Sequence, residues 1–323
     1  MCEQKLSIVF MGTPRFACPS LEKLAEQEKV VAVVTQPDRP VGRGKKIASP
    51  PLKVVASKIG IPVYQPRDIK APAFLKEITF FNPDLIVVVA FGGVLPETII
   101  EIPKILSINL HPSLLPKYRG PAPVAWALIK GETHTGVTIQ KIRKEVDRGE
   151  IILQKKLAIE PEDSCGTLSI KLSHLGAKML TQAIKLIKEG KVKLKPQQGR
   201  GSYAPKITKQ MGKINWGNSA WEIHNLVRGL NPSPGAYAIF FPKDKPCQIK
   251  IWKTNLRKDI LDRKENTPGT VVKIKKEEGF VVKTAKEALL VKEVQLPGKN
   301  RISAYDFIKG YHIQEGFVLG GQN

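Results

Sequence analysis

The sequence predicts an α/β protein in which a doubly wound, mainly parallel sheet is followed by a small β-barrel. Three observations support this fold class. Over the first two-thirds of the chain, short apolar segments alternate with segments of helical spacing. The run LIVVVA at residues 85–90 is apolar throughout, as expected of a central parallel strand covered on both faces. From residue 236 onwards, short strands alternate with turn residues, which is typical of a barrel.

The elements of the parallel sheet follow from local patterns. Apolar and β-branched runs predict strands over residues 6–10, 30–34, 62–64, 85–90, 105–110, 136–142 and 151–159. Apolar residues at helical spacing predict helices over residues 19–29, 52–59, 121–130 and 168–188. Residues 35–49 are expected to form a long loop after the second strand.

A change of composition separates the sheet from the barrel. Residues 185–213 contain nine Lys or Arg and one acid, Glu189, which predicts an exposed basic linker. Beyond it, we predict a helix over residues 220–228 and strands over residues 236–241, 248–253, 270–274, 280–284 and 289–294. The expected organisation is therefore a domain of residues 1–189, a linker of residues 190–213 and a domain of residues 214–323.

The charge balance points to a polyanionic partner. The chain of 323 residues carries 52 Lys and Arg against 29 Asp and Glu, a formal net charge of +23. Such a surplus favours nucleic acid or an anionic membrane surface as partner. The alternative is a generally lysine-rich composition without a recognition role.

Composition also limits compartment and cofactor. Four cysteines without C-x-x-C spacing and five scattered histidines make no zinc set, so we expect no metal. The N-terminus lacks the pattern of a signal peptide, and the longest apolar run, residues 85–93, is too short to span a bilayer. We therefore expect a cytoplasmic protein without a membrane partner. Separately, we expect it to act as a monomer.

The loop after the first strand argues against two nucleotide-binding classes. Gly12 and Pro14 follow this strand without the G-x-G-x-x-G pattern of a dinucleotide site. The chain also lacks the pattern G-x-x-x-x-G-K-[ST] that cradles the phosphates of ATP.

The segment PDRPVGRGKK, residues 37–46, is a basic loop with two interpretations. It contains four cations, Arg39, Arg43, Lys45 and Lys46. It is either a solvated loop, or a mobile loop at the carboxyl side of the sheet that clamps a phosphate backbone.

The strongest candidate for a catalytic site is NLHPSLLP, residues 109–116. Asn109 and His111 lie two residues apart at the end of a strand, so their side chains share one side. An amide can donate to a carbonyl oxygen, and an imidazole can move a proton near neutral pH. The alternative is a turn in which both side chains cap backbone groups.

Asp147 is the candidate partner of His111. It lies in a turn-like stretch before Gly149, and a carboxylate beside an imidazole orients the ring and stabilises its cation. Spacing alone does not show that the two residues meet, and the alternative is an ordinary turn residue. The remaining histidines are interpreted as surface or packing residues: His134, His174, His224 and His312.

These motifs carry a resemblance to a known family. N-x-H-P-S-L-L-P, then R-G at residues 119–120 and D-x-G-x-I at residues 147–151, resemble the formyltetrahydrofolate-dependent formyltransferase superfamily. QPDRPVGRG at residues 36–44 and NPSPGA at residues 231–236 are similar to its transfer-RNA branch, the methionyl-tRNA formyltransferases. The resemblance covers essentially the whole chain.

The resemblance implies a Rossmann-like folate-binding domain and an OB-like C-terminal barrel that helps to hold transfer RNA. The implied reaction moves the formyl group of 10-formyltetrahydrofolate to the α-amine of methionine on initiator methionyl-tRNA, for translation initiation, without a metal. Asn109, His111 and Asp147 fall on the catalytic positions. Asn109 and protonated His111 are expected to stabilise an oxyanion, and Asp147 is expected to hold His111.

The resemblance also implies binding residues. The folate is expected near Phe91, Gly92, Leu95, Ser113, Leu114, Leu115, Pro116, Arg143 and Asp147. Transfer RNA is expected to contact Arg39, Arg43, Lys45, Lys46 and Lys206. The methionine pocket is expected to contain Phe10, Met11, Gly12 and Pro14.

Three other functions are open at this point. A glycinamide ribonucleotide or amino-sugar formyltransferase shares the three catalytic positions but needs neither the basic loop nor the basic linker. A formyltetrahydrofolate hydrolase uses water as acceptor. An RNA-binding protein without activity has no need of the His111 and Asp147 pair.

Overall fold

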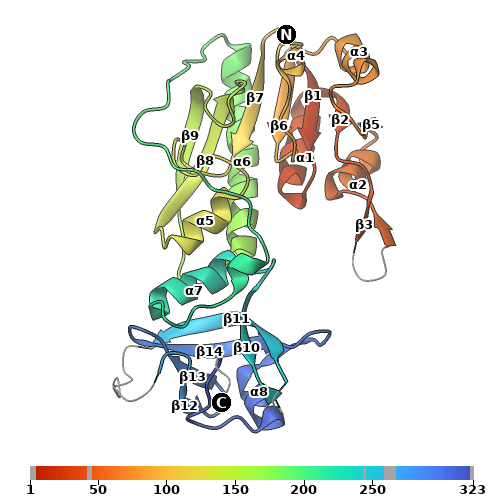
Figure 1. The fold of residues 1–323 in the computed structure, drawn as a ribbon. Coiled ribbons are helices and arrows are strands. Elements are labelled where there is room, and N and C mark those ends of the chain that lie inside the picture. The colour runs from red at the N-terminus through yellow and green to blue at the C-terminus, as the bar shows by residue number, and fades with distance from the viewer. Residues whose placement is uncertain (1–4, 42–45, 243–244, 258–266, 321–323) are drawn as a thin grey trace. The chain divides into compact units, whose positions relative to one another are not determined.

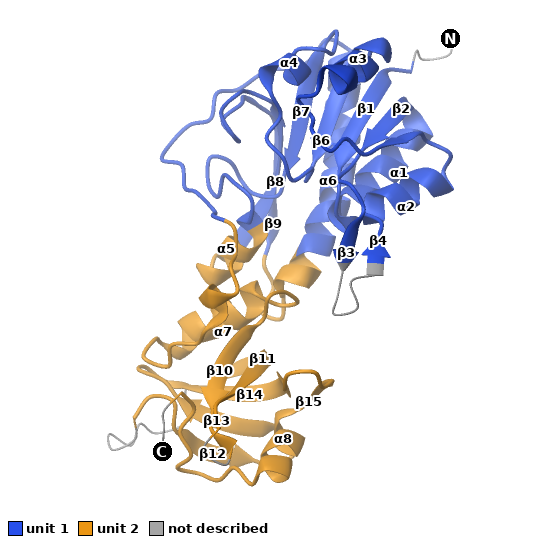
Figure 2. Cartoon of the chain, turned by 45° about the vertical axis from the view of Figure 1, so that its right-hand side comes forward, with its two compact units in different colours: residues 1–123, 134–158, 169–205 blue, residues 124–133, 159–168, 206–323 orange. Residues whose placement is uncertain are grey.

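In a computed structural model, the protein consists of two compact units (Figures 1 and 2). The structure describes residues 5–41, 46–242, 245–257 and 267–320. The first unit comprises residues 1–123, 134–158 and 169–205, and the second comprises residues 124–133, 159–168 and 206–323. The predicted fold class is confirmed, because a mostly parallel sheet in the first unit is followed by an antiparallel β unit.

The first unit is built on a seven-stranded sheet (Figure 1). In sheet order its strands are β5 (Val63–Tyr64), β2 (Lys29–Val34), β1 (Ser7–Gly12), β6 (Leu85–Val89), β7 (Leu106–His111), β8 (His134–Lys141) and β9 (Ile151–Ala158). The first five are parallel, whereas β8 and β9 are antiparallel to β7 and to each other. Each of the seven predicted strands has its counterpart here, with ends that differ by two residues at most.

Helices cover this sheet because its central strands are apolar on both faces. They are α1 (Cys18–Gln27), α2 (Pro51–Lys58), α3 (Pro72–Phe80), α4 (Glu97–Ile100) and α6 (Cys165–Lys188), with a 3-10 turn η1 (Arg15–Ala17). Helix α5 (Pro123–Ile129) belongs to the second unit except for its first residue. All five residues of β6 are buried. Val9 and Val88 pack with Phe74 of α3 on one face. On the other face, Gly176 lets α6 approach β7, since a Cβ there would lie 2.6 Å from Leu110.

Three parts of the first unit differ from the expectation, and one of them is the short helix α4, which was not predicted. Within the predicted loop 35–49, β3 (Arg39–Val41) and β4 (Lys46–Ala48) pair as an antiparallel hairpin, which supplies hydrogen-bond partners to backbone groups of an exposed segment. Helix α3 was not predicted. It begins with Pro72 in its first turn, and Phe74 and Ile78, four residues apart, form its buried side.

The second unit is an antiparallel sheet closed by the C-terminal segment. Its strands are β10 (Ala236–Phe240), β11 (Cys247–Arg257), β14 (Ala288–Gln295), β13 (Gly279–Lys283) and β12 (Val271–Lys275) in sheet order, and β15 (Arg301–Ser303) pairs with β14. Leu319 N–H donates to Gly269 O beside β12 at 2.9 Å, and Gly320 N–H donates to Ile239 O of β10 at 2.7 Å. The segment therefore joins the two outer strands, which agrees with the predicted barrel.

Two capped helices pack on this sheet, and a 3-10 turn η2 (Gln210–Gly212) precedes them. Helix α7 (Ala220–Gly229) starts with a capping box in which Ser219 and Glu222 satisfy each other's backbone N–H groups. Helix α8 (Ala304–Tyr311), which was not predicted, has Ser303 as its N-cap. Phe307 of α8 is fully buried and contacts Phe240 edge to face, with ring centroids 5.4 Å apart.

His224 of α7 is a packing residue whose protonation opposes folding. Its Nδ1 lies 3.0 Å from Thr254 Oγ1 of β11. Burial lowers the pKa of His224 from 6.5 to about 4, and the nearby Arg228 cation acts in the same direction. Between these two pH values, the unfolded chain binds a proton on His224 that the folded chain does not bind.

We therefore expect the His224→Gln variant to lose less stability in acid than the wild-type protein. Stability linked to His224 is fully present above pH 6.5 and decreases as the pH falls towards about 4. At about 1.4 kcal/mol per pKa unit, the wild type loses up to about 3 kcal/mol more of its free energy of unfolding in acid than the variant does. Urea unfolding of both proteins at pH 7 and near pH 4.5 measures it. Equal pH dependence in the two proteins would contradict this account.

Candidate active site

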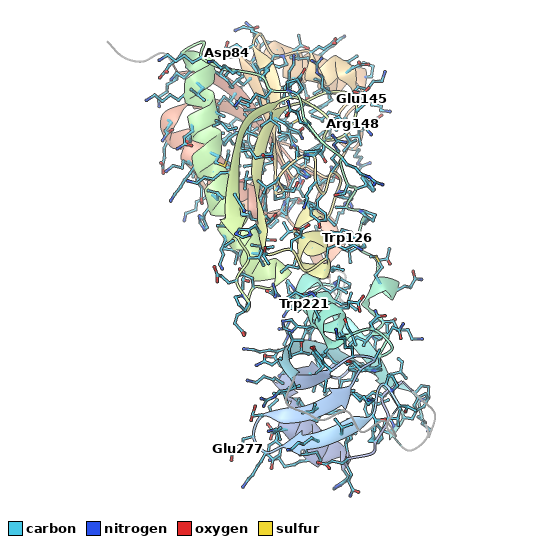
Figure 3. The ribbon with its side chains drawn as sticks, turned by 90° about the vertical axis from the view of Figure 1, so that its left-hand side faces the viewer. Asp84, Trp126, Glu145, Arg148, Trp221 and Glu277 are labelled. Carbon is cyan, nitrogen blue, oxygen red and sulfur yellow. The ribbon has the colours of Figure 1, made fainter. Side chains whose placement is uncertain are left out.

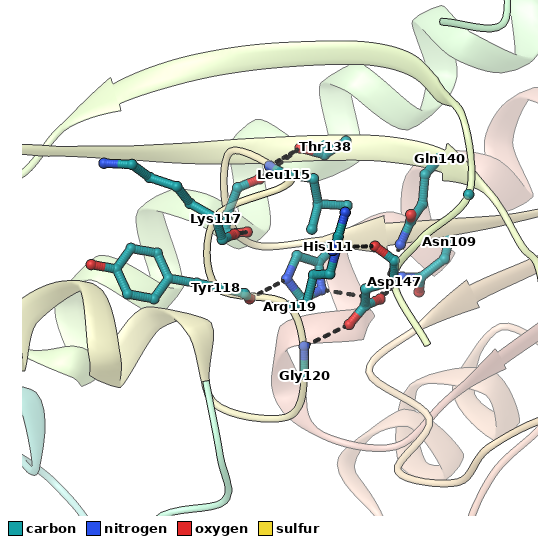
Figure 4. Close-up of polar contacts among 12 residues, drawn as sticks. Asn109, His111, Leu115, Lys117, Tyr118, Arg119, Gly120, Thr138, Gln140 and Asp147 are labelled. Carbon is teal, nitrogen blue, oxygen red and sulfur yellow. Dashed lines mark hydrogen bonds and ion pairs between the residues drawn. The ribbon is translucent and has the colours of Figure 1, made fainter. Parts of the chain in front are cut away.

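Asn109 and His111 on β7 meet Asp147, which lies in the loop between β8 and β9 (Figure 4). Asp147 Oδ1 lies 3.4 Å from Asn109 Nδ2 and 3.5 Å from His111 Nδ1. Strand β7 is extended, so its residues 109 and 111 present their side chains to the same face of the sheet. The structure thus brings together the three residues that the sequence singled out.

Both ring nitrogens of His111 face oxygen acceptors. Nε2 lies 2.9 Å from the carbonyl oxygen of Tyr118, and Nδ1 faces Asp147. The residue is only 4% exposed, so water does not compete for these contacts. These two contacts fix the orientation of the ring, because each nitrogen faces one oxygen.

The carboxylate of Asp147 is held by further donors. Gly120 N–H donates to Oδ2 at 2.8 Å, and the Gln140 amide donates to Oδ1 at 3.0 Å. Asp147 has φ of 54°, in the left-handed region that non-glycine residues adopt only when their surroundings impose it. Glu145 and Arg148, exposed residues of the same loop, flank it (Figure 3). The loop conformation is therefore fixed by the groups around Asp147.

A cavity of about 120 Å³ opens beside Asn109 and Asp147. Its floor is a row across three strands, because Val88 of β6 pairs with Asn109 and Asn109 pairs with Gln140 of β8. The other residues that line it are Gly93, Val94, Leu95, Lys141, Ile142, Arg143, Lys144, Val146 and Gly149. The cavity therefore combines an apolar wall, three polar side chains and a basic rim.

The basic rim is oriented by carboxylates. Arg143 pairs with Glu150 through two hydrogen bonds, and Lys144 Nζ lies 3.1 Å from Glu97. The bond from Arg143 lowers the pKa of the Glu150 carboxyl and raises the pKa of Arg143 itself. Lys141 also lines the cavity, next to this pair.

Some of the residues predicted to contact the folate line the cavity, and the rest lie outside it. Leu95, Arg143 and Asp147 line the cavity. Phe91 is buried in the core, and its carbonyl oxygen accepts from Thr13 Oγ1 at 2.8 Å, while Gly92 follows it with φ of 87°. Residues 113–116 do not line this cavity, and they form the turn after β7: Ser113, Leu114, Leu115 and Pro116.

None of the described residues predicted for methionine and transfer RNA lines this cavity. Phe10 and Met11 are completely buried, and Gly12 is buried beside them, whereas Pro14 is exposed. Arg39 of β3 and Lys206 are exposed, and Lys46 starts β4. Arg43 and Lys45 lie outside the described residues.

Sequence reasoning missed three side chains that support Asp147: Gln140, Arg119 and Gln197. Arg119 Nε donates to the backbone carbonyl of Asp147 at 3.1 Å, and Gln197 Nε2 donates to the same oxygen at 2.8 Å. Arg119 stands in the quoted R-G motif, so that motif was a usable signal. Gln140 and Gln197 had none, because strand register and the path of the linker decide where they lie.

Among the described residues, no group of three or more His, Cys, Asp or Glu side chains is placed to hold a metal ion. Within the same residues, no helix has the length and apolar character needed to cross a membrane.

Comparison with known proteins identifies the family. Residues 5–184 match the model of the formyl transferase family, and residues 206–312 match that of the formyl transferase C-terminal domain. The chain belongs to the formyl transferase family. Its curated formyl transferase relatives include the methionyl-tRNA formyltransferase of Thermodesulfovibrio yellowstonii, 46% identical over 96% of this chain and 97% of that protein. The methionyl-tRNA formyltransferase of Geobacter metallireducens is 42% identical over 98% and 99%.

Solved structures share the fold of this formyl transferase at lower identity. The sugar 3N-formyl transferase WlaRD is 20% identical, with a TM-score of 0.64 over 92% of this chain and all of that chain. HypX from Aquifex aeolicus, solved in complex with tetrahydrofolic acid, is 17% identical, with a TM-score of 0.62 over 95% of this chain and 48% of that chain. At these identities the likeness establishes the fold alone.

Gly149 is required for the close turn of the loop that carries Asp147. A Cβ there would overlap the carbonyl oxygen of Lys141, whereas a Cβ on Gly93 in the same cavity would make ordinary contact with Phe91 at 3.5 Å. We expect Gly149→Ala to lower the free energy of unfolding by about 1–3 kcal/mol, as in other overpacked sites.

Urea unfolding of Gly149→Ala, with Gly93→Ala as the matched control, measures this difference. Equal stability of the two variants would show that the loop adapts to a larger residue at position 149.

Proposed function

We propose that this formyl transferase moves the formyl group of 10-formyltetrahydrofolate to the α-amine of methionine on initiator methionyl-tRNA. The observation that carries the proposal is the meeting of Asn109, His111 and Asp147 beside the cavity. The chain is also 42–46% identical to methionyl-tRNA formyltransferases over nearly its whole length, which supports this acceptor over a sugar or a nucleotide amine.

The three polar side chains have complementary tasks in this reaction. The Asn109 amide donates to the carbonyl oxygen that becomes negative when the amine attacks. The His111 cation adds positive charge next to it, and Asp147 keeps the ring oriented and charged. The neutral amine attacks the formyl carbon, and the Asp147 carboxylate can take, through water, the proton that the amine nitrogen then loses. The same proton can pass to the folate nitrogen, which leaves as tetrahydrofolate when its bond to the formyl carbon breaks. Gln140 and Gly120 serve Asp147 by holding its two oxygens.

The cavity fits a folate ring system. A flat heteroaromatic ring needs apolar walls together with a few donors and acceptors at fixed positions. Leu95, Ile142 and Val146 supply the walls, and Gln140 and the loop backbone supply the polar groups. The folate is the formyl donor, and when bound it supplies the one-carbon group. Lys141, Arg143 and Lys144 stand at the rim, where the folate carboxylates can pair with them.

The surplus of basic residues then has a function in binding transfer RNA. A transfer RNA acceptor arm is a dense line of phosphates, and Lys and Arg contacts supply most of its sequence-independent affinity. We assign this role to the hairpin and the linker, through Arg39, Arg43, Lys45, Lys46 and Lys206. The proposed organisation is a catalytic domain of residues 1–189, a basic linker of residues 190–213 and a transfer-RNA-binding barrel of residues 214–323. We propose that the methionyl group of the substrate binds near residues 10–14. We also propose that the enzyme is a monomer and acts in the cytoplasm.

Formylation assays test the function and the roles together. The wild-type protein with 10-formyltetrahydrofolate is expected to formylate initiator methionyl-tRNA, and not elongator methionyl-tRNA or glycinamide ribonucleotide. Asn109→Ala is expected to lower kcat by about 100- to 1,000-fold, as removal of an oxyanion donor does elsewhere. Asp147→Asn is expected to lower it by about 100-fold or more.

Glu145→Gln is the control for Asp147→Asn, because it makes the same carboxylate-to-amide change at an exposed position of the same loop. Its activity is expected to equal that of the wild type. Formylation of a small amine or of water, with no transfer RNA formylated, would move the protein to another branch of the family. Full activity of Asn109→Ala would show that Asn109 is not the donor that stabilises the oxyanion.

Transfer RNA binding should depend on salt through the hairpin. Arg39→Ala is expected to weaken binding and to reduce the slope of log affinity against log salt by about 1, because each lost phosphate contact retains roughly one counterion. Lys76→Ala, at an exposed position of α3, is the control. Filter binding between about 50 and 200 mM salt measures the slopes. Over this range, a protein with several phosphate contacts loses about 10³-fold or more in affinity. Equal slopes for the two variants would exclude Arg39 from the contact.

A further inference from the structure

Residues 195–204, which we call the strap, belong to the first unit and lie against the active site. At one end, Lys195 and Ile151 exchange backbone hydrogen bonds of 2.8 and 3.0 Å. At the other end, Arg119 N–H donates to Ser202 O at 2.9 Å, and Ala204 N–H donates to Arg119 O at 2.7 Å. A segment that was predicted to be an exposed linker is therefore anchored to β9 and to the turn after β7.

Gln197 is the strap residue that reaches the loop of Asp147. Its Nε2 donates to the carbonyl oxygens of Asp147 and Gly149, both at 2.8 Å. Its Oε1 accepts from Arg119 Nη2 at 2.6 Å and from Nε at 3.1 Å. Arg119 Nε in turn lies 3.1 Å from the Asp147 carbonyl oxygen. The Gln197 side chain thus donates hydrogen bonds to the loop of Asp147 and accepts hydrogen bonds from Arg119, which binds the same loop.

The fit between strap and turn is close. A Cβ on Gly201 would lie 2.7 Å from Arg119 Nη1, and a Cβ on Gly120 would lie 2.5 Å from the Tyr203 ring. Gly120 is also the residue whose N–H donates to the Asp147 carboxylate. The strap therefore reaches Asp147 through two routes, the backbone of the loop and the turn that carries Gly120.

We propose that Gln197 is a positioning residue, which holds the backbone of Asp147 so that its carboxylate faces His111 and Asn109. The inference rests on the proposed function, in which Asp147 takes part in formyl transfer. Gln197 acts through Asp147, and within the part of the chain that the structure describes its amide forms hydrogen bonds with the loop, Arg119 and Gln140. The left-handed conformation of Asp147 explains why such support is needed, because an unsupported non-glycine residue leaves this region readily.

The informative substitution is Gln197→Glu. It keeps the size of the side chain and an oxygen for Arg119, but it replaces the amide donor by an oxygen that faces two carbonyl oxygens. Gln198→Glu is the matched control, because Gln198 is exposed and the change in charge is the same one residue away. Gln197→Met, which removes both polar functions without adding charge, is the second variant, and thermal unfolding of every variant shows whether it folds.

At saturating transfer RNA and folate, we expect Gln197→Glu to lower kcat by about 10- to 100-fold, the range that a displaced catalytic group produces. Gln198→Glu is expected to stay within about twofold of the wild type, and both KM values are expected to change little. A loss that appears only in KM, or an equal loss in Gln198→Glu, would overturn the inference.

A double-mutant cycle separates positioning from general damage. In the Asp147→Asn background, Gln197→Glu is expected to cost less than about twofold, because the group that it positions is already removed. Losses that multiply in the double variant would show that Gln197 acts independently of Asp147.

A second readout does not depend on activity. The ring ¹⁵N signals of His111, which report on its contact with Asp147, are expected to shift in Gln197→Glu and not in Gln198→Glu. Unchanged signals would overturn the positioning role. If these signals shift while the wild type formylates no transfer RNA, the proposed function fails and the geometry of the support stands.

Discussion

The candidate active site depends on one constraint, the fixed position of the Asp147 carboxylate. The residue stands in a left-handed conformation that costs on the order of 1–3 kcal/mol, and donors on all sides offset this cost. Gly120 and Gln140 bind its side-chain oxygens, and Arg119 and Gln197 bind its backbone oxygen. A charged acceptor with several donors forms stronger hydrogen bonds than a neutral one, so the loop can hold a single arrangement next to His111.

The sheet supplies the surface on which this arrangement stands. Strand β8 runs antiparallel to β7, so the loop after β8 leaves at the level of Ile108 and folds back across the sheet to reach Asn109. Register then aligns Val88, Asn109 and Gln140 side by side. Strand pairing therefore places the apolar side chain of Val88 next to the amides of Asn109 and Gln140 at the base of the cavity. The antiparallel pair β8–β9 thus places the loop of Asp147 over a face that helices cover elsewhere in the sheet.

The basic segment after α6 has two properties that composition alone does not separate. Its lysines and arginines give it the polyanion-binding character on which the transfer RNA proposal rests. Its backbone and Gln197 are bound to β9 and to the turn that holds Asp147. Under the transfer RNA proposal, this segment contacts both the RNA and the loop of Asp147, and it then connects RNA binding physically with the position of Asp147.

Much of this protein was determined by the sequence itself. Apolar and β-branched runs predicted all seven strands of the first sheet, and the i, i+2 spacing of Asn109 and His111 predicted that they share a face. These are local properties, which neighbouring residues set. Tertiary structure decided the rest. Strand register and loop path decide whether Asp147 meets His111, whether Gln140 lies beside Asn109, and whether Gln197 lies in an exposed linker or beside Asp147. Both arise from contacts between residues far apart in the chain.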